Sequence, residues 1–103
     1  MVKFYLYRIK KYDRENDQSL NAVISINPKV ISEARAKDEA LKTMEMSSQL
    51  KYSVFGMPIL LKDNIDSENM PTTAGAVALK DNFTKYAFIV EKLKSKGAII
   101  LGK

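Results

Sequence analysis

The sequence predicts an α/β fold, with two or three helices and a small mixed sheet that contains a βαβ unit. Three observations predict this class. Apolar residues recur at helical spacing in three segments, two short apolar runs have the composition of buried strands, and one of the helical segments lies between those two runs. A chain of 103 residues is one domain at most, or a piece of one.

The first segment, 1–12, has the spacing of an amphipathic helix. Its periodic positions are Val2, Tyr5, Leu6, Ile9 and Tyr12. Phe4 and Tyr7 lie outside that face, so the pattern is also compatible with a strand. Lysines and arginines lie between these aromatic residues, as they do on surfaces that stack on single-stranded nucleic acid. The core and rim of an amphipathic helix is the more frequent reason for such a pattern, and we favour it.

The next elements are a short strand and a second helix. Apolar and polar residues alternate over 20–26, which predicts the strand. Asn27 and Pro28 end it, because asparagine is a good N-cap and proline suits the first helical position. An apolar stripe then predicts a helix over 28–46, followed by a connector over 47–55.

The second half predicts strand, loop, helix and strand. The apolar runs 59–62 and 98–101 are the strands, and 63–76 is a long polar loop. Tyr86, Ile89, Val90 and Leu93 line one face of the helix between them, with Thr84 as its N-cap and Gly97 as its end. Strands joined in this way are parallel, so their carboxyl ends share one edge of the sheet, where ligands bind in open α/β sheets. Three residues are expected at that edge: Lys62, Gly102 and Lys103.

Composition excludes several kinds of mechanism. The chain has no cysteine and no histidine, so it holds no disulfide, no thiolate metal site, no cysteine nucleophile and no Ser-His-Asp triad. An enzymatic reaction has to use lysine, serine, tyrosine or carboxylate groups.

The net charge of +5 is compatible with nucleic acid, an anionic membrane or plain solubility, and we favour solubility. The longest uncharged stretches, 52–61 and 69–79, have about half the length of a membrane span, so we expect no membrane partner. No signal peptide is visible at the start, and we expect a cytoplasmic protein.

Three blocks in the second half resemble the amidase signature family. Residues 56–66 read GMPILLKDNID, 70–79 read MPTTAGAVAL, and 87–103 read AFIVEKLKSKGAIILGK. The corresponding sequence motifs of the family are similar. The first is G-I-P, three apolar residues and K-D-N, and the second is P-T-T-A-G-S. The third is a helix followed by A-G-A, a strand and G-K. The first half resembles the family more loosely. Departures are Ala76 in place of the serine, Tyr86 in place of an acidic residue, and YSVFG at 52–56 in place of G-P-L-H-G.

The resemblance implies hydrolysis of a carbon–nitrogen (amide) bond by a Ser-Ser-Lys triad, without cofactor or metal. Lys62 matches the lysine of the triad, which burial keeps neutral in a complete enzyme so that it can accept a proton. It acts through a bridging serine on a nucleophilic serine, and the substrate is a small amide. The amidase-type subunits of tRNA-dependent amidotransferases belong to the same family, and nothing in the sequence separates the two uses.

The glycine- and serine-rich segment that carries both family serines has no match in this sequence. The chain's serines lie outside any glycine-rich context; they are Ser19, Ser25, Ser32, Ser47, Ser48, Ser53, Ser67 and Ser95. We therefore expect 1–103 to be the N-terminal part of an amidase domain, from a truncated or split gene or an expressed fragment, and inactive alone. It would pair with the remaining amidase portion or with itself, or serve as a non-catalytic interaction module. Without covering residues, we expect water to reach the Lys62 amine.

Overall fold

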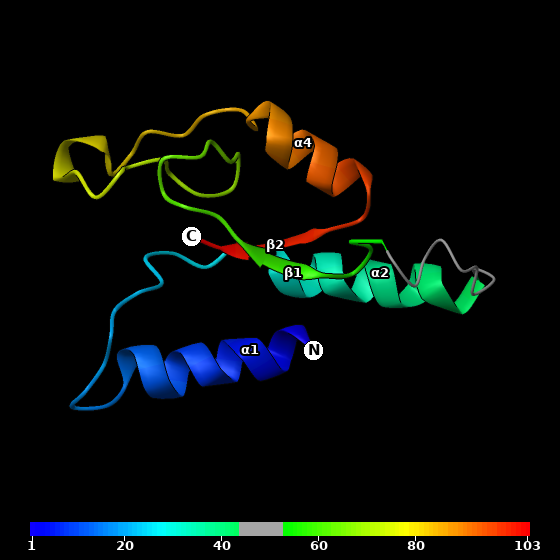
Figure 1. Cartoon of the computed structure of the whole chain (residues 1–103), viewed down its shortest axis with the longest axis horizontal. Coiled ribbons are helices and arrows are strands. Elements are labelled where there is room, and N and C mark those ends of the chain that lie inside the picture. Colours follow the sequence, from blue (N-terminus) through cyan, green and yellow to red (C-terminus); the bar gives the residue numbers. More distant parts are fainter. Residues whose placement is uncertain (44–52) are drawn as a thin grey trace.

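The computed structural model describes residues 1–43 and 53–103. Figure 1 shows its helices and strands along the chain. In order they are helix α1 (Val2–Arg8), the π-helix Ile9–Arg14, helix α2 (Val30–Thr43), strand β1 (Pro58–Leu60), the 3-10 helix Val77–Leu79, helix α4 (Phe88–Ser95) and strand β2 (Ile99–Gly102). The expected α/β class and the two expected parallel strands are therefore confirmed.

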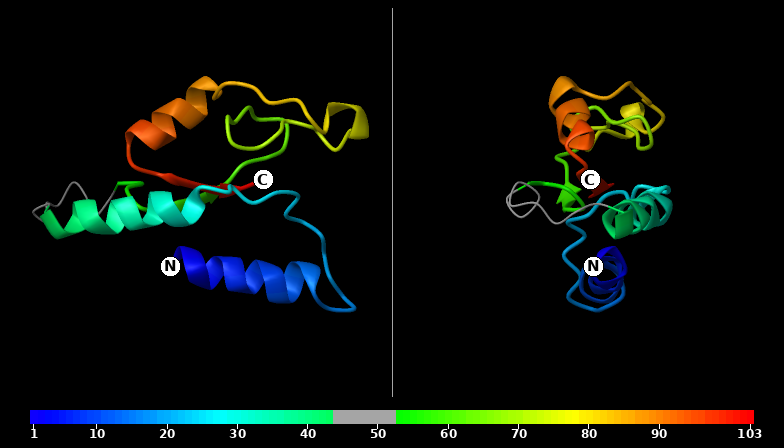
Figure 2. Two further views of the ribbon diagram at one scale, coloured as in Figure 1. Left: turned by 180° about the vertical axis from the view of Figure 1, so that it is seen from behind. Right: turned by 90° about the vertical axis from the view of Figure 1, so that its right-hand side faces the viewer.

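The two strands form the middle layer of the molecule. Helix α4 covers one face of this small sheet, while α2 and α1 lie on the other side (Figures 1 and 2). Ile100 of β2 is opposite Ile59 of β1 in the parallel pairing. All four residues of β2 are buried, as expected for a strand that is covered on both faces.

Alternate residues of β2 supply two separate apolar cores. Ile99 and Leu101 pack with Val2 of α1 and Val30 of α2. Ile100, which points to the opposite face, packs instead in a core whose other buried members are Leu61, Met70 and Val90. The continuous apolar run in this part of the sequence thus reflects burial on both sides of one strand.

Asn27 joins β2 to the start of α2. Its side-chain oxygen accepts a hydrogen bond from the Lys29 N–H at 3.0 Å, and its side-chain nitrogen donates to the Ile100 carbonyl at 2.8 Å. Asn27 thus holds the turn that leads into α2, although the helix begins at Val30, two residues later than predicted. The predicted helix 28–46 agrees with α2 from Val30 to Thr43. Residues 44–46 and most of the predicted connector 47–55 lie outside the described residues.

The strand predicted over 20–26 is reduced to a single antiparallel bridge between Ile26 and Gly102. Local side-chain hydrogen bonds explain the difference. The Asp13 carboxylate accepts hydrogen bonds from the N–H groups of Ala22 and Val23, so these groups bind a side chain and not a neighbouring strand. The sheet itself therefore consists of the two parallel strands β1 and β2, and the antiparallel pairing expected of a mixed sheet is limited to this isolated bridge.

Tyr5 and Tyr12 are wrongly predicted as part of the buried face of the first helix. Both are exposed, at 42% and 51%. For Tyr12 the reason is the π-helix that begins at Ile9, because it shifts later residues away from the apolar stripe; Tyr5 lies before it. The guanidinium carbon of Arg8 lies 5.3 Å from the centre of the Tyr12 ring, a cation–π contact that favours this ring at the surface.

The helix before β2 begins later than predicted. Its N-cap is Ala87, with extended backbone, and Thr84 lies outside the helix, where its hydroxyl is 3.5 Å from that of Thr72. Tyr86 precedes the helix yet packs against the second core, whereas Ile89 is 58% exposed. Gly97 ends the helix as predicted, with a φ of +88°.

Candidate functional site

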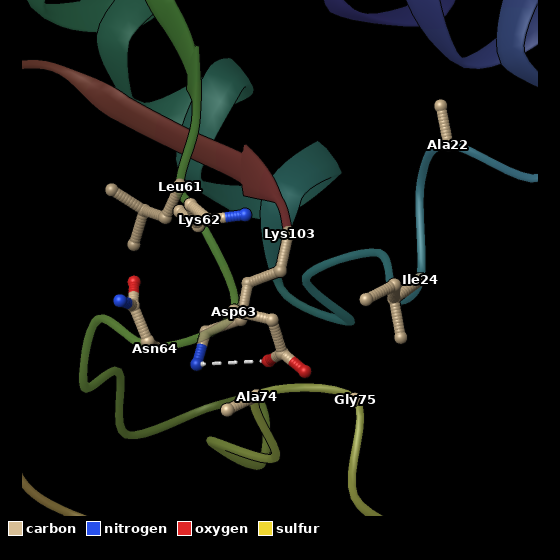
Figure 3. A pocket seen from close by; sticks show the side chains of 9 residues that line it. All are labelled: Ala22, Ile24, Leu61, Lys62, Asp63, Asn64, Ala74, Gly75 and Lys103. Atoms are coloured by element: carbon tan, nitrogen blue, oxygen red, sulfur yellow. Dashed lines mark ion pairs between the residues drawn. The ribbon is translucent and has the colours of Figure 1, made fainter.

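An open cavity of about 400 Å³ lies where β1 and β2 end (Figure 3). Its lining combines the ends of both strands with two loops. The lining residues are Ala22, Ile24, Leu61, Lys62, Asp63, Asn64, Ala74, Gly75 and Lys103. The structure thus brings Lys62 and Lys103 to the same edge of the sheet, as the predicted parallel pairing requires.

Lys62 lies two residues after the end of β1, and its side chain is exposed at this edge. Its neighbours on both sides are buried: Leu61 is 8% exposed and Asp63 is 7% exposed. Alternation along extended backbone explains the contrast, because successive side chains point in opposite directions. The expectation that water reaches the Lys62 amine in this chain is confirmed by its exposure.

Main-chain hydrogen bonds hold the segment around Lys62. The Leu61 N–H donates to the Gly102 carbonyl at 3.0 Å, which continues the strand pairing past β1. The Ala74 N–H donates to the Asp63 carbonyl at 3.1 Å, and the Ile65 N–H donates to the Lys62 carbonyl at 3.0 Å. The lysine therefore sits on a backbone that is fixed from both sides.

Lys103 follows β2 and, unlike Lys62, has a fully buried side chain. Its amine donates hydrogen bonds to the Pro71 carbonyl at 3.1 Å and to the Thr72 hydroxyl at 2.9 Å. Asp63 Oδ1 lies 3.6 Å from the same nitrogen. Two hydrogen-bond acceptors and one carboxylate thus surround the amine of Lys103.

Asp63 completes this buried cluster. Its Oδ2 accepts a hydrogen bond from the Thr73 hydroxyl. Burial acts to raise the pKa of the Asp63 carboxyl, but hydrogen bonds from Thr73 and Gly75 and the charge of Lys103 outweigh it, so that the pKa lies below its ordinary value. Burial lowers the pKa of Lys103, and the charge of Asp63 opposes this effect without cancelling it. We refer to Asp63, Thr72, Thr73 and Lys103 as the buried cluster.

The sequence indicates part of this site and misses part of it. The predicted strand order places Lys62 and Lys103 at the carboxyl edge of the sheet, whereas sequence patterns assign no role to Asp63, Thr72 or Thr73. The signal available for them is their position inside the K-D-N and P-T-T-A-G blocks. Among the residues that the structure describes, no serine lines the cavity of Lys62, so a nucleophile for this lysine is not found there.

Comparison with known proteins identifies the family. A sequence model of the amidase family matches residues 1–103. The chain belongs to the amidase family. It is 36% identical over 102 residues to a glutamyl-tRNA(Gln) amidotransferase subunit of Lawsonia intracellularis, an alignment that covers 93% of this chain and 21% of that protein.

Solved structures of amidases contain the same fold. Native peptide amidase from Stenotrophomonas maltophilia matches with a TM-score of 0.83 and 35% identity, over 99% of this chain and 20% of that chain. Allophanate hydrolase from Kluyveromyces lactis matches with a TM-score of 0.63 and 28% identity, over 99% of this chain and 16% of that chain. This chain therefore spans about a fifth of the length of the amidotransferase subunit and of the peptide amidase.

Two general features concern the described residues as a whole. No helix within 1–43 or 53–103 is both long and apolar enough to cross a bilayer. Within the same ranges, no group of three or more acidic side chains is arranged to hold a metal ion. The polar side chains that line the cavity itself are those of two lysines, one aspartate and one asparagine.

Proposed function

We propose that this chain supplies the general base of an amidase that hydrolyses carbon–nitrogen bonds through a Ser-Ser-Lys mechanism. Lys62 is the proposed base, and both serines come from a part of the enzyme outside these 103 residues. The neutral amine of Lys62 takes a proton from a bridging serine, which in turn takes one from the nucleophilic serine. That serine attacks the amide carbonyl, and the proton passes back from Lys62 to the leaving nitrogen, which departs as ammonia or an amine. Water then hydrolyses the acyl-enzyme, which releases the acid and the serine.

The position of Lys62 is the observation that carries this proposal. Lys62 lies in the block that resembles the family's lysine motif, two residues after β1, and its side chain is exposed beside an open cavity at the carboxyl edge of the sheet. A lysine with an exposed amine can receive serines from another segment without rearrangement of its own backbone. In the complete enzyme that segment would also exclude water, which favours the neutral amine.

We further propose that residues 1–103 form a single but incomplete domain. The Cα radius of gyration is 14.9 Å, against roughly 13 Å for a compact domain of this length. Large apolar side chains are exposed on several elements, among them Phe83 at 61%, Phe88 at 74% and Leu60 at 49%. Such surfaces call for a covering partner, which we propose to be the remaining amidase portion or a second copy.

A second candidate function is part of an amidotransferase's amidase-type subunit. The amidotransferase sequence of Lawsonia intracellularis supports it, because its identity to this chain is similar to that of peptide amidase. A third candidate is an interaction module that has kept the fold without catalysis. A cytoplasmic location stays a prediction in each case.

A chimera tests the proposed function. The matching fifth of Stenotrophomonas maltophilia peptide amidase is replaced by this chain, and hydrolysis of a peptide amide is measured. We expect turnover in the chimera and background rates in its Lys62→Met variant, with Lys80→Met as the control for loss of an exposed lysine elsewhere. A folded chimera whose activity survives Lys62→Met would overturn the role of Lys62.

The isolated chain gives the complementary result. We expect no turnover of simple amides by 1–103 alone, because the glycine- and serine-rich segment is absent from it. Reading the coding DNA after Lys103 distinguishes the candidates further. A following frame that encodes that segment favours a complete or split enzyme, and its absence favours the interaction module.

A further inference from the structure

The buried cluster joins three segments that are distant in sequence. Asp63 lies three residues after β1, Lys103 directly follows β2, and Thr72 and Thr73 lie in the loop before the 3-10 helix Val77–Leu79. In Figure 3 a dashed line joins Lys103 to Asp63, the residue immediately after Lys62. The cluster therefore acts on the backbone directly beside the proposed base.

We propose that Asp63 and Lys103 are positioning residues: their buried pair fixes the end of β1 and, with it, the direction in which Lys62 presents its amine to the cavity. The proposal rests on the proposed function, because Lys62 matters here as the reacting group. Neither residue has to touch the substrate. They act through the backbone that connects Asp63 to Lys62.

Burial sets this pair apart from the other ion pairs of the described residues. The side chains of Lys103 and Asp63 are 0% and 7% exposed, whereas those of Lys94 in α4 and Glu33 in α2 are 28% and 24% exposed. Solvent and salt weaken a buried pair much less than an exposed one. The geometry of the Asp63–Lys103 pair is therefore maintained while solvent reaches the rest of the cavity.

A role in geometry accounts for the pair better than a role in stability. Two buried charges gain little net stability over apolar residues of similar size, because each loses its hydration. Directional contacts, by contrast, restrict the conformation of the backbone. Asp63 is held by Thr73 at one oxygen and faces Lys103 at the other, while its carbonyl accepts the Ala74 N–H. Few backbone conformations satisfy all three of these contacts, so the direction of the preceding side chain, that of Lys62, is restricted as well.

The test uses the full chain and needs no turnover, so its failure is distinct from a failure of the amidase proposal. Lysine side chains are labelled with carbon-13, and the Lys62 signal is assigned with a Lys62→Arg variant. Contacts between the Lys62 side chain and the methyl groups of Ala22 and Ala74, which line the same cavity, are measured by NMR. These contacts report the direction of the side chain.

The decisive variant combines Asp63→Ala with Lys103→Met, because removal of both charges leaves neither unpaired. We expect it to stay folded, with the Val90 methyl signals of the core unchanged, while the Lys62 contacts fall about twofold or more. Lys94→Met, which breaks the other partly buried pair, is the matched control and should leave the Lys62 contacts unchanged.

The single variants separate positioning from general stability. Asp63→Asn keeps an acceptor for Thr73 and should lose fewer Lys62 contacts than the double variant. Each single variant should lower the urea midpoint more than the double variant does, because it leaves one buried group unpaired. A folded double variant with wild-type Lys62 contacts would overturn the proposal, and so would an equal loss of contacts in Lys94→Met.

Discussion

Replacement of Gly102 by alanine probes a close backbone approach between β2 and the 24–27 segment. A Cβ at this position would lie well under 3.0 Å from the Ser25 carbonyl oxygen, closer than real Cβ atoms come to other atoms, and 3.3 Å from Ile26 Cα. Both neighbours are main-chain atoms, which cannot rotate away as a side chain can. Either β2 or the 24–27 segment has to move.

The movement loosens hydrogen bonds that hold the 24–27 segment on β2. The Lys103 N–H donates to the Ser25 carbonyl at 2.9 Å, and the Asn27 N–H donates to the Leu101 carbonyl at 3.0 Å. Overpacking costs about 1–3 kcal/mol, and a weakened hydrogen bond adds about 1 kcal/mol. We therefore expect Gly102→Ala to lower the free energy of unfolding by about 2–4 kcal/mol.

Urea unfolding followed by circular dichroism measures this loss, with Gly56→Ala as the control. Gly56 has a φ of +72° and nothing lies within 4 Å of the position that a Cβ would take there, so that its replacement costs only backbone strain, about 1–2 kcal/mol. The reasoning is refuted if Gly102→Ala proves no more destabilising than Gly56→Ala. The close approach to Ser25 would then be absent in solution.

Three further predictions concern charge and assembly. Lys62→Met should leave the free energy of unfolding of the isolated chain within about 0.5 kcal/mol of wild type, because the side chain is exposed; a larger loss in urea unfolding would show a structural role. Because the pKa of Asp63 is lowered from 3.8, its contribution to stability is complete above that value and is lost as the pH falls through the folded-state pKa. The difference in unfolding free energy between wild type and Asp63→Asn should therefore shrink on acidification below about pH 4, and an unchanged difference down to about pH 2 would contradict the ion pair. Finally, the exposed Phe83 and Phe88 predict self-association or a low melting temperature, and sedimentation that finds a monomer with a high, cooperative melting temperature would disagree.

The elements that the sequence determined are those whose pattern is local and whose surroundings are simple. The apolar run before Gly102 predicts a buried strand, and β2 is buried on both faces. Asn27 and Gly97 mark helix ends because their backbone and capping preferences do not depend on the rest of the fold. The order of strand, helix and strand was enough to place Lys62 and Lys103 at one edge.

Tertiary structure decided the features that depend on competing partners. The alternating segment 20–26 has the pattern of a strand, yet the Asp13 carboxylate takes two of its N–H groups. Lys62 and Lys103 have the same side chain at equivalent strand ends, but one is exposed and the other is buried. Lys103 is buried because Pro71, Thr72 and Asp63, 31 or more residues away in the chain, surround its amine with oxygen atoms. Such an environment exists only after the loop has folded over the end of the sheet, so periodicity and composition contain no trace of it.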